Sequence, residues 1–110
     1  MEKASLLENL DFSESKAAVA VLLKTSTSKE VRILLKKDQV MKEHKAPFPI
    51  LIEIFEGSIE FGNNGEHQIL HRGDLISLDA SVPHDLKALT DAIIRLTVYK
   101  QDTIERINAI

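Results

Sequence analysis

The sequence predicts a single all-β domain, folded as a small sandwich or barrel. From about residue 17 onward, short apolar stretches alternate with turn-forming residues, a pattern typical of these folds. The chain has 110 residues, a common size for one domain, and its 44% hydrophobic and 28% charged residues are ordinary for a globular protein. We therefore expect one domain over residues 1–110, with the barrel core over about residues 17–99.

The first two expected strands lie on either side of a polar connection. Residues 17–24 are mainly apolar, residues 24–28 are lysine, threonine and serine, and residues 30–35 mix β-branched and aliphatic side chains. Residues 36–38, Lys-Lys-Asp, are expected to turn the chain.

The next expected strand, residues 50–55, shows the clearest alternation in the chain. Its two faces carry Ile50, Ile52 and Ile54 on one side and Leu51, Glu53 and Phe55 on the other. Successive side chains of a strand point to opposite sides, so the isoleucine face is expected to line the barrel interior. The opposite face is expected to meet water or a partner subunit.

A hairpin is expected after this strand. Gly57 interrupts the apolar run, which resumes over residues 59–61 and returns over residues 66–70. Between them, residues 62–65 read Gly-Asn-Asn-Gly and supply the positive-φ residues that a tight hairpin needs.

The remaining expected strands follow two further turns. Residues 72–74 are expected to turn the chain into a buried strand at residues 75–78. Pro83 fixes its own φ and biases the preceding residue to an extended conformation, so His84 enters the following strand in a defined direction. The last strand is expected over residues 92–99.

The two ends of the chain carry different patterns. Asp102 and Glu105 resemble a capping box, and isoleucines recur every third residue after them, so a short C-terminal helix is expected over residues 102–110. Residues 5–12 are compatible with either a helical turn or an edge strand.

Composition excludes several classes of function. The chain has no cysteine, so it cannot form a disulfide or use a sulfur ligand or nucleophile. Its net charge is -3 and its lysines are spread among acids, so nucleic acid is not an expected partner. The longest uncharged apolar run, residues 17–23, is too short to span a membrane, and the N-terminus lacks the pattern of a secretory signal. We expect a cytoplasmic protein.

Two stretches of the chain resemble the two motifs of the cupin family. One runs from His44 to Gly57 and the other from Gly73 to His84, about fifteen residues apart. The resemblance covers roughly residues 30–98 and is to the small single-domain cupins. It implies a cupin-type jelly-roll β-barrel.

The resemblance also implies where a cupin metal site would lie. The first motif usually offers two histidines and a glutamate, and these positions hold His44, Ala46 and Ile50 here; the third histidine of the family corresponds to His84. Ala46 and Ile50 cannot coordinate a metal, whereas such sites usually have three or more protein ligands. We therefore expect no metal or other cofactor; if a metal did bind, its ligands would be His44 and His84.

The second motif is incomplete as well. Asp79 and Ser81 stand where the family often has proline and glycine, and Ala88 stands where it often has asparagine. The expectation of a barrel rests on strand spacing, glycines and apolar alternation, which these changes leave intact.

The motif positions outline a candidate ligand pocket made of His44, Phe48, Ile50, Ile52 and His84. Its isoleucines favour a dry pocket over one that holds an ion. Phe48 lies between two prolines in a loop expected to be stiff, and a lid over the barrel mouth is the alternative. His44 is equally compatible with an exposed loop residue, and His84 with a residue that satisfies a backbone carbonyl.

Two other histidines are better explained as surface residues. His67 and His71 would share one side of a strand about 13 Å apart, which is too far to chelate one ion. No nucleophile and base can be paired from the sequence.

The sequence favours a non-catalytic cupin barrel that binds a small ligand in an apolar pocket and forms a homodimer through sheet faces and edge strands. The alternative is a metal-dependent cupin enzyme of the dioxygenase or isomerase type that uses His44 and His84, completed by water, substrate or Glu43. A third hypothesis is an interaction domain whose outer sheet contacts another protein.

Overall fold

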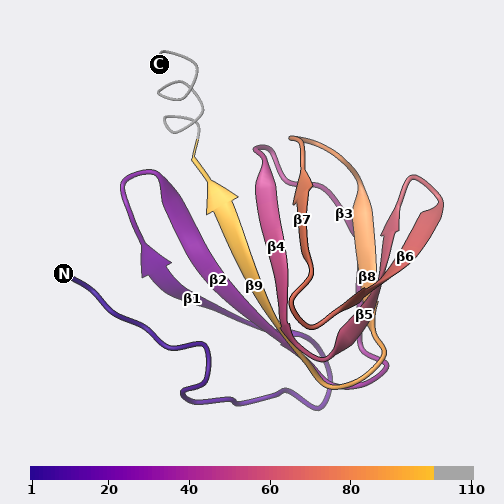
Figure 1. Ribbon diagram of the computed structural model, residues 1–110, viewed down its shortest axis with the longest axis horizontal. Coiled ribbons are helices and arrows are strands. Elements are labelled where there is room, and N and C mark those ends of the chain that lie inside the picture. The colour runs from indigo at the N-terminus through magenta and orange to yellow at the C-terminus, as the bar shows by residue number, and fades with distance from the viewer. Residues whose placement is uncertain (101–110) are drawn as a thin grey trace.

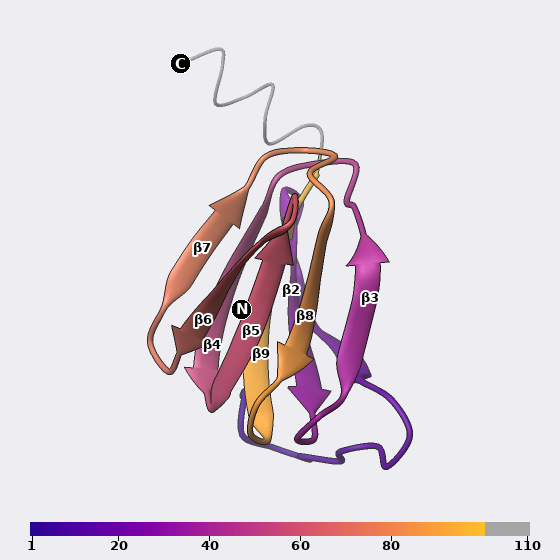
Figure 2. The same cartoon turned by 90° about the vertical axis from the view of Figure 1, so that its right-hand side faces the viewer.

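The computed structural model describes residues 1–100 and folds them into two antiparallel β-sheets (Figure 1). The strands are β1 (Ala18–Lys24), β2 (Ser28–Leu35), β3 (Val40–His44), β4 (Ile50–Glu56), β5 (Ser58–Asn63), β6 (Glu66–His71), β7 (Leu75–Leu78), β8 (His84–Ala88) and β9 (Ala92–Tyr99). A five-stranded sheet has the order β1-β2-β9-β4-β7, and a four-stranded sheet has the order β3-β8-β5-β6. Figure 2 looks onto the four-stranded sheet, with β3 at one edge and β6 at the other.

The hydrophobic core lies between the two sheets. The isoleucine face of β4 points inward as expected, since Ile50, Ile52 and Ile54 are only 5%, 4% and 0% exposed. The sheets lie close together where β4 ends and β9 begins and diverge toward the opposite end (Figure 1). Side chains at the close end, among them Leu35 and Ile59, are fully buried. The barrel is therefore packed solid at one end and open at the other.

Most of the expected strands are present, with boundaries shifted by one or two residues. One strand was missed: β3, because the sequence analysis assigned no strand between the turn at residues 36–38 and residue 50. Residues 6–9 form bends and the rest of residues 5–12 is irregular, so neither of the two structures expected for this segment is present. The C-terminal helix expected over residues 102–110 lies outside the described residues.

The outer face of the five-stranded sheet holds a half-buried charge network. Arg95 on β9 donates from Nε to Glu53 at 2.7 Å and from Nη1 to Glu30 at 2.9 Å. Thr97 donates to the same oxygen of Glu30 at 2.7 Å. The hydrogen bond to Glu53, with support from Glu30, raises the pKa of Arg95 above its ordinary value despite partial burial. This network links strands β2, β9 and β4 from outside the core.

The N-terminal segment crosses the same sheet near β2 and is anchored by one arginine. Arg32 is 6% exposed, and its guanidinium donates to the backbone carbonyls of Leu6, Glu8 and Asn9 at 3.3, 2.6 and 3.0 Å. Hydrogen bonds from a charged donor are stronger than those between neutral groups. Arg32 therefore fixes the path of the chain before β1.

The hairpin and the β4–β5 corner have the backbone that their residues predict. Asn64 and Gly65 have φ values of 52° and 78°, which the two-residue turn between β5 and β6 requires. Gly57 has a φ of 88°, and a Cβ atom there would lie 2.3 Å from the carbonyl oxygen of Asp91. Gly57 thus allows the backbone before β9 to approach this corner closely.

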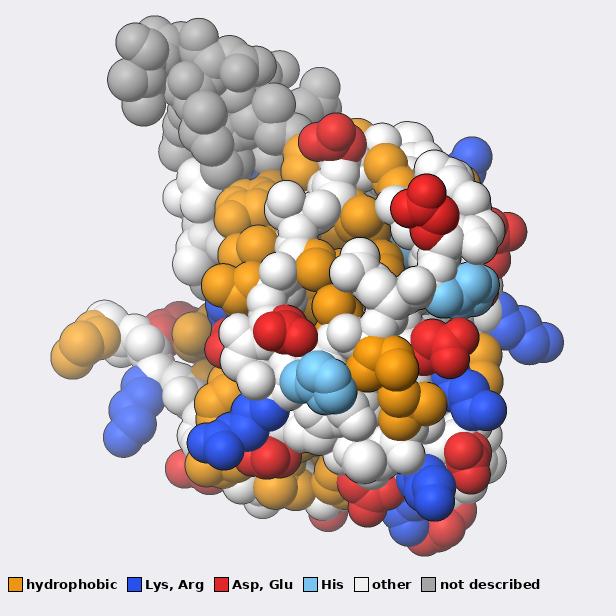
Figure 3. All heavy atoms as spheres, turned by 45° about the vertical axis from the view of Figure 1, so that its right-hand side comes forward, with side chains coloured by type: hydrophobic (Ala, Val, Ile, Leu, Met, Phe, Trp, Pro, Cys, Tyr) orange, Lys and Arg blue, Asp and Glu red, His pale blue; other side chains and the backbone are white. Residues whose placement is uncertain are grey.

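The molecular surface mixes charges of both signs. Figure 3 shows acidic and basic side chains interspersed with apolar ones over the face that it presents, without a large field of one sign. Among the described residues, no helix is long and apolar enough to cross a membrane.

Replacing Gly57 by alanine is expected to destabilise the fold far more than the same change at Gly73. Both glycines have φ near 90°, so both variants bear the strain of a left-handed backbone, ~1 to 2 kcal/mol. Only at Gly57 does the new methyl group collide with backbone, because nothing lies within 4 Å of a Cβ atom at Gly73. We expect Gly57→Ala to lower the free energy of unfolding by ~3 kcal/mol or more in denaturant titrations. Equal losses for the two variants would contradict the close packing at this corner.

Candidate functional site

A cavity of about 190 Å³ lies between the sheets toward their open end. Most of its wall is aliphatic. Its lining residues are Val19, Ile33, Met41, His44, Ala46, Ile50, Ile52, His84, Leu86, Ile94, Leu96 and Val98. Four of the five residues of the predicted pocket are therefore brought together, since His44, Ile50, Ile52 and His84 all line this cavity.

His84 is held rigidly at the first position of β8. It is 4% exposed, and its ring stacks on Phe61 with centroids 5.8 Å apart and planes 15° from parallel. Its Nδ1 atom lies 3.0 Å from the carbonyl oxygen of Val82, on the far side of Pro83. His84 therefore makes the contact with a backbone carbonyl that the sequence left open as an alternative for it, and its ring lines the cavity as well.

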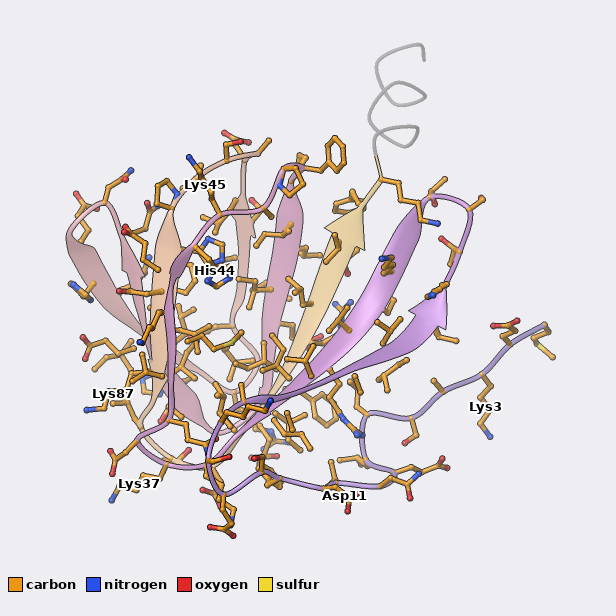
Figure 4. All side chains as sticks on the ribbon, turned by 180° about the vertical axis from the view of Figure 1, so that it is seen from behind. Lys3, Asp11, Lys37, His44, Lys45 and Lys87 are labelled. Carbon is orange, nitrogen blue, oxygen red and sulfur yellow. The ribbon has the colours of Figure 1, made fainter. Side chains whose placement is uncertain are left out.

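His44 approaches from the end of β3 and completes a pair of imidazoles. Its ring centroid lies 4.3 Å from that of His84, at an angle of 60° between planes. Its Nδ1 atom lies 2.8 Å from the carbonyl oxygen of Lys42. Figure 4 shows His44 at the end of β3, within the outline of the two sheets. The ring is exposed on one side, so it forms part of the cavity mouth.

A bulge in β3 directs His44 toward the cavity. Met41 and His44 are three residues apart, so regular alternation would place them on opposite faces. The register of β3 against β8 shifts between these two residues, and both line the cavity. A bulge inserts one extra residue and re-aims the side chains that follow it.

The backbone contacts fix the tautomer of both rings. A carbonyl oxygen only accepts hydrogen bonds, so in the neutral form each Nδ1 atom carries the proton and each Nε2 atom keeps a lone pair. Within residues 1–100, neither Nε2 atom has a hydrogen-bond partner. The pair thus provides two hydrogen-bond acceptors beside an aliphatic wall.

The loops that carry the two motifs are tied together at this end of the barrel. The N–H group of Ser81 donates to the carbonyl oxygen of Ala46 at 2.7 Å. Ser81 has a φ of 64°, the left-handed conformation that suits the glycine found at this position in the resembled family. The serine therefore retains the backbone conformation although the glycine is absent.

The residues present do not fit the transition-metal site that the resemblance implies. Ala46 and Ile50 line the cavity at the positions of two ligands. Among the described residues, no group of three or more histidines, cysteines, aspartates or glutamates could hold a metal ion. Two imidazoles fall short of the three or four ligands that such sites use.

Glu43, considered as a further ligand, lies elsewhere. It lines a shallow hollow with Gly62, His67 and Asp85 and does not line the cavity with the two histidines. Phe48 is half-buried in the connection between β3 and β4 and is also outside the cavity lining. His67 is exposed and lies 3.3 Å from Glu60, in agreement with a surface role.

Sequence reasoning missed part of the cavity wall. Met41 was overlooked because β3 was not expected, and its contribution depends on the bulge. Leu96 and Val98 lie on the face of β9 that alternation assigns to the interior, so that pattern would have identified them.

Among the comparisons with known proteins, only the one with solved structures found matches. No protein-family model and no curated protein matches it. An RmlC-like cupin protein from Desulfovibrio desulfuricans has a TM-score of 0.82 and 24% identity over 90% of this chain and 96% of its own. A conserved protein with a double-stranded β-helix domain from Klebsiella pneumoniae has a TM-score of 0.79 and 20% identity, with 90% and 89% covered.

A cupin superfamily protein from Desulfitobacterium hafniense is similar at a TM-score of 0.74 and 11% identity, over 81% of this chain and 82% of its own. The Klebsiella protein is itself described as uncharacterised. At these sequence identities the comparisons establish the fold only and show neither a ligand nor an activity. The chain has the fold of the cupin superfamily, as its two motifs predicted.

Proposed function

We propose that this small cupin-fold protein binds a small, largely apolar ligand in the cavity between its sheets, without catalysing a reaction. The observation that supports this most is the composition of the wall, in which two imidazoles face an otherwise aliphatic surface. Apolar cavities with a few fixed polar groups are the usual form of small-molecule sites. The two Nε2 acceptors would orient the ligand.

The site is rigid where it meets the ligand. His84 is fixed by Phe61 and by the carbonyl of Val82, and the aliphatic wall belongs to the central strands β4 and β9. A preformed site loses little entropy on binding. Access is through the mouth, where His44 is exposed.

The proposal includes a homodimer. The outer face of the five-stranded sheet carries half-buried Leu51 and Phe55 beside Leu75, which is 58% exposed. The edge strand β1 presents Val19 and Val21 at 58% and 48% exposure. A second copy would cover such surfaces and edges. Sedimentation velocity at micromolar concentration tests this part, and a monomer would contradict it.

A metal-dependent enzyme of the dioxygenase or isomerase type remains the alternative, because both histidines keep Nε2 free as metal ligands often do. The shortage of ligands among residues 1–100 argues against it. We expect protein purified without chelators to contain far less than one equivalent of iron, manganese, nickel or zinc by elemental analysis. Near one equivalent, lost in His84→Ala, would contradict the metal-free site and favour the alternative.

A bulky residue at Ala46 is expected to block the cavity. Ala46 lies in a loop and lines the wall, so phenylalanine there would enter the cavity without breaking a strand. Ala80 is an exposed loop residue outside the wall and provides the matched control. With cyclohexanol as the probe, NMR titrations should perturb the methyl groups of Ile52 and Ile94 in the wild type and in Ala80→Phe.

Binding of cyclohexanol to Ala46→Phe should be weaker by about 10-fold or more, because the new ring removes most of the apolar contact. The proposal fails if cyclohexanol leaves the methyl signals of the wild type unchanged, or if the two variants bind it equally.

A further inference from the structure

The register of the four-stranded sheet places four polar side chains in one row. His44 pairs with His84, His84 pairs with Asn63, and Asn63 pairs with Glu66, across strands β3, β8, β5 and β6. Directly paired residues project from the same face of a sheet. The row therefore crosses the inner face of this sheet at the open end of the barrel.

Alternation along β5 and β6 confirms which face this is. Ile59 and Phe61 on β5 belong to the core, and Asn63 follows at the same spacing. On β6, Leu70 belongs to the core, and Glu66 lies four residues before it. Asn63 and Glu66 thus occupy inward-facing positions, although the hairpin motif suggested only a turn.

The row continues past the cavity into a second hollow. This hollow has a volume of about 520 Å³ and opens between β6 and β7, with Phe61, Asn63, Glu66, Gln68, Ile76 and Leu78 in its wall. Phe61 separates the two compartments, since one face of its ring stacks on His84, which lines the first cavity. His44 and His84 line the first cavity and Asn63 and Glu66 line the second hollow, so a ligand that contacts the whole row would extend past Phe61.

Asn63 carries an unsatisfied group at the centre of the row. Its Oδ1 atom is buried and has no hydrogen-bond partner among the described residues. Buried polar atoms are nearly always paired, so each exception needs an explanation. A ligand that donates a hydrogen bond to this atom would supply the missing partner.

The polar groups of the row are mainly acceptors. The Nε2 atoms of His44 and His84, the Oδ1 atom of Asn63 and the carboxylate of Glu66 all accept hydrogen bonds. The facing wall, from β4 and β9, contributes aliphatic side chains such as Ile52 and Leu96. The site therefore has one accepting side and one apolar side.

We propose that the natural ligand has an apolar frame with at least two hydrogen-bond donors along one edge, and that the row His44, His84, Asn63 and Glu66 recognises those donors. This inference rests on the proposed function and adds the chemical class of the ligand. Hydroxyl and ammonium groups both supply such donors. The carboxylate of Glu66, at the rim, favours an ammonium group. The experiment therefore compares hydroxyl donors with an ammonium donor.

The test compares three probes by calorimetry on the full chain. Cyclohexanol has one donor group, cyclohexane-1,3-diol has two hydroxyls about as far apart as neighbouring residues of the row, and 3-aminocyclohexanol replaces one hydroxyl by ammonium. The wild type should bind the better of the two bifunctional probes about 3- to 10-fold more tightly than cyclohexanol, as one additional hydrogen bond predicts.

Asn63→Leu removes the central acceptor at similar volume. It should bring the affinity for the diol down to that of cyclohexanol measured in the same variant. The thermal midpoint should rise or stay constant, because an unpaired buried polar atom is removed. A structural role for Asn63 would instead lower the midpoint. Glu66→Gln then distinguishes the two donor groups. If 3-aminocyclohexanol no longer binds more tightly than cyclohexanol in this variant, the donor that Glu66 recognises is an ammonium group. If the diol still binds more tightly than cyclohexanol, the donors that the row recognises are hydroxyl groups.

Cyclohexanol binding that equals or exceeds that of both bifunctional probes in the wild type would overturn this inference and leave the proposed function intact. Failure of all three probes to bind would instead contradict the proposed function.

Discussion

The register of the four-stranded sheet is the constraint on which the site depends. It places His44, His84, Asn63 and Glu66 in one row on the inner face. A shift of one residue would turn a strand's side chains to the opposite face and remove its member of the row. On β3 this register includes a bulge after Met41, without which His44 would face outward. Binding geometry is therefore a direct consequence of backbone pairing.

The rest of the fold holds this register from both ends of the barrel. At the closed end, Gly57 lets the backbone at Asp91 approach the β4–β5 corner, and fully buried aliphatic side chains fill the space between the sheets. At the open end, the hydrogen bond from Ser81 to Ala46 joins the loops that precede His84 and follow His44. The closed end is consequently packed, while the open end keeps a cavity. Tight packing at one end of the barrel is therefore compatible with a preformed site at the other.

The sequence predicted those parts of the structure in which local pattern and burial agree. Alternation in residues 50–55 and the positive-φ pair in the 62–65 hairpin were sufficient to place strands and turns. It did not predict β3, because Val40–His44 is largely exposed and polar and carries no apolar periodicity. Nor could it predict the bulge or the position of Asn63, since cross-strand register depends on pairing between segments distant in the chain. The sequence did predict that a strand begins at His84, because Pro83 fixes the backbone just before it.

The proposed site depends on free Nε2 lone pairs that the two histidines present to a ligand in an apolar cavity. Long-range ¹H–¹⁵N NMR of the imidazole rings at neutral to mildly alkaline pH tests it most directly, because the nitrogen shifts distinguish the two tautomers. We expect the rings of His44 and His84 both to carry the proton on Nδ1, and their Nε2 signals to move when cyclohexanol or a diol is added. A proton on Nε2 of either ring, or Nε2 signals that do not respond to these probes, would contradict this expectation.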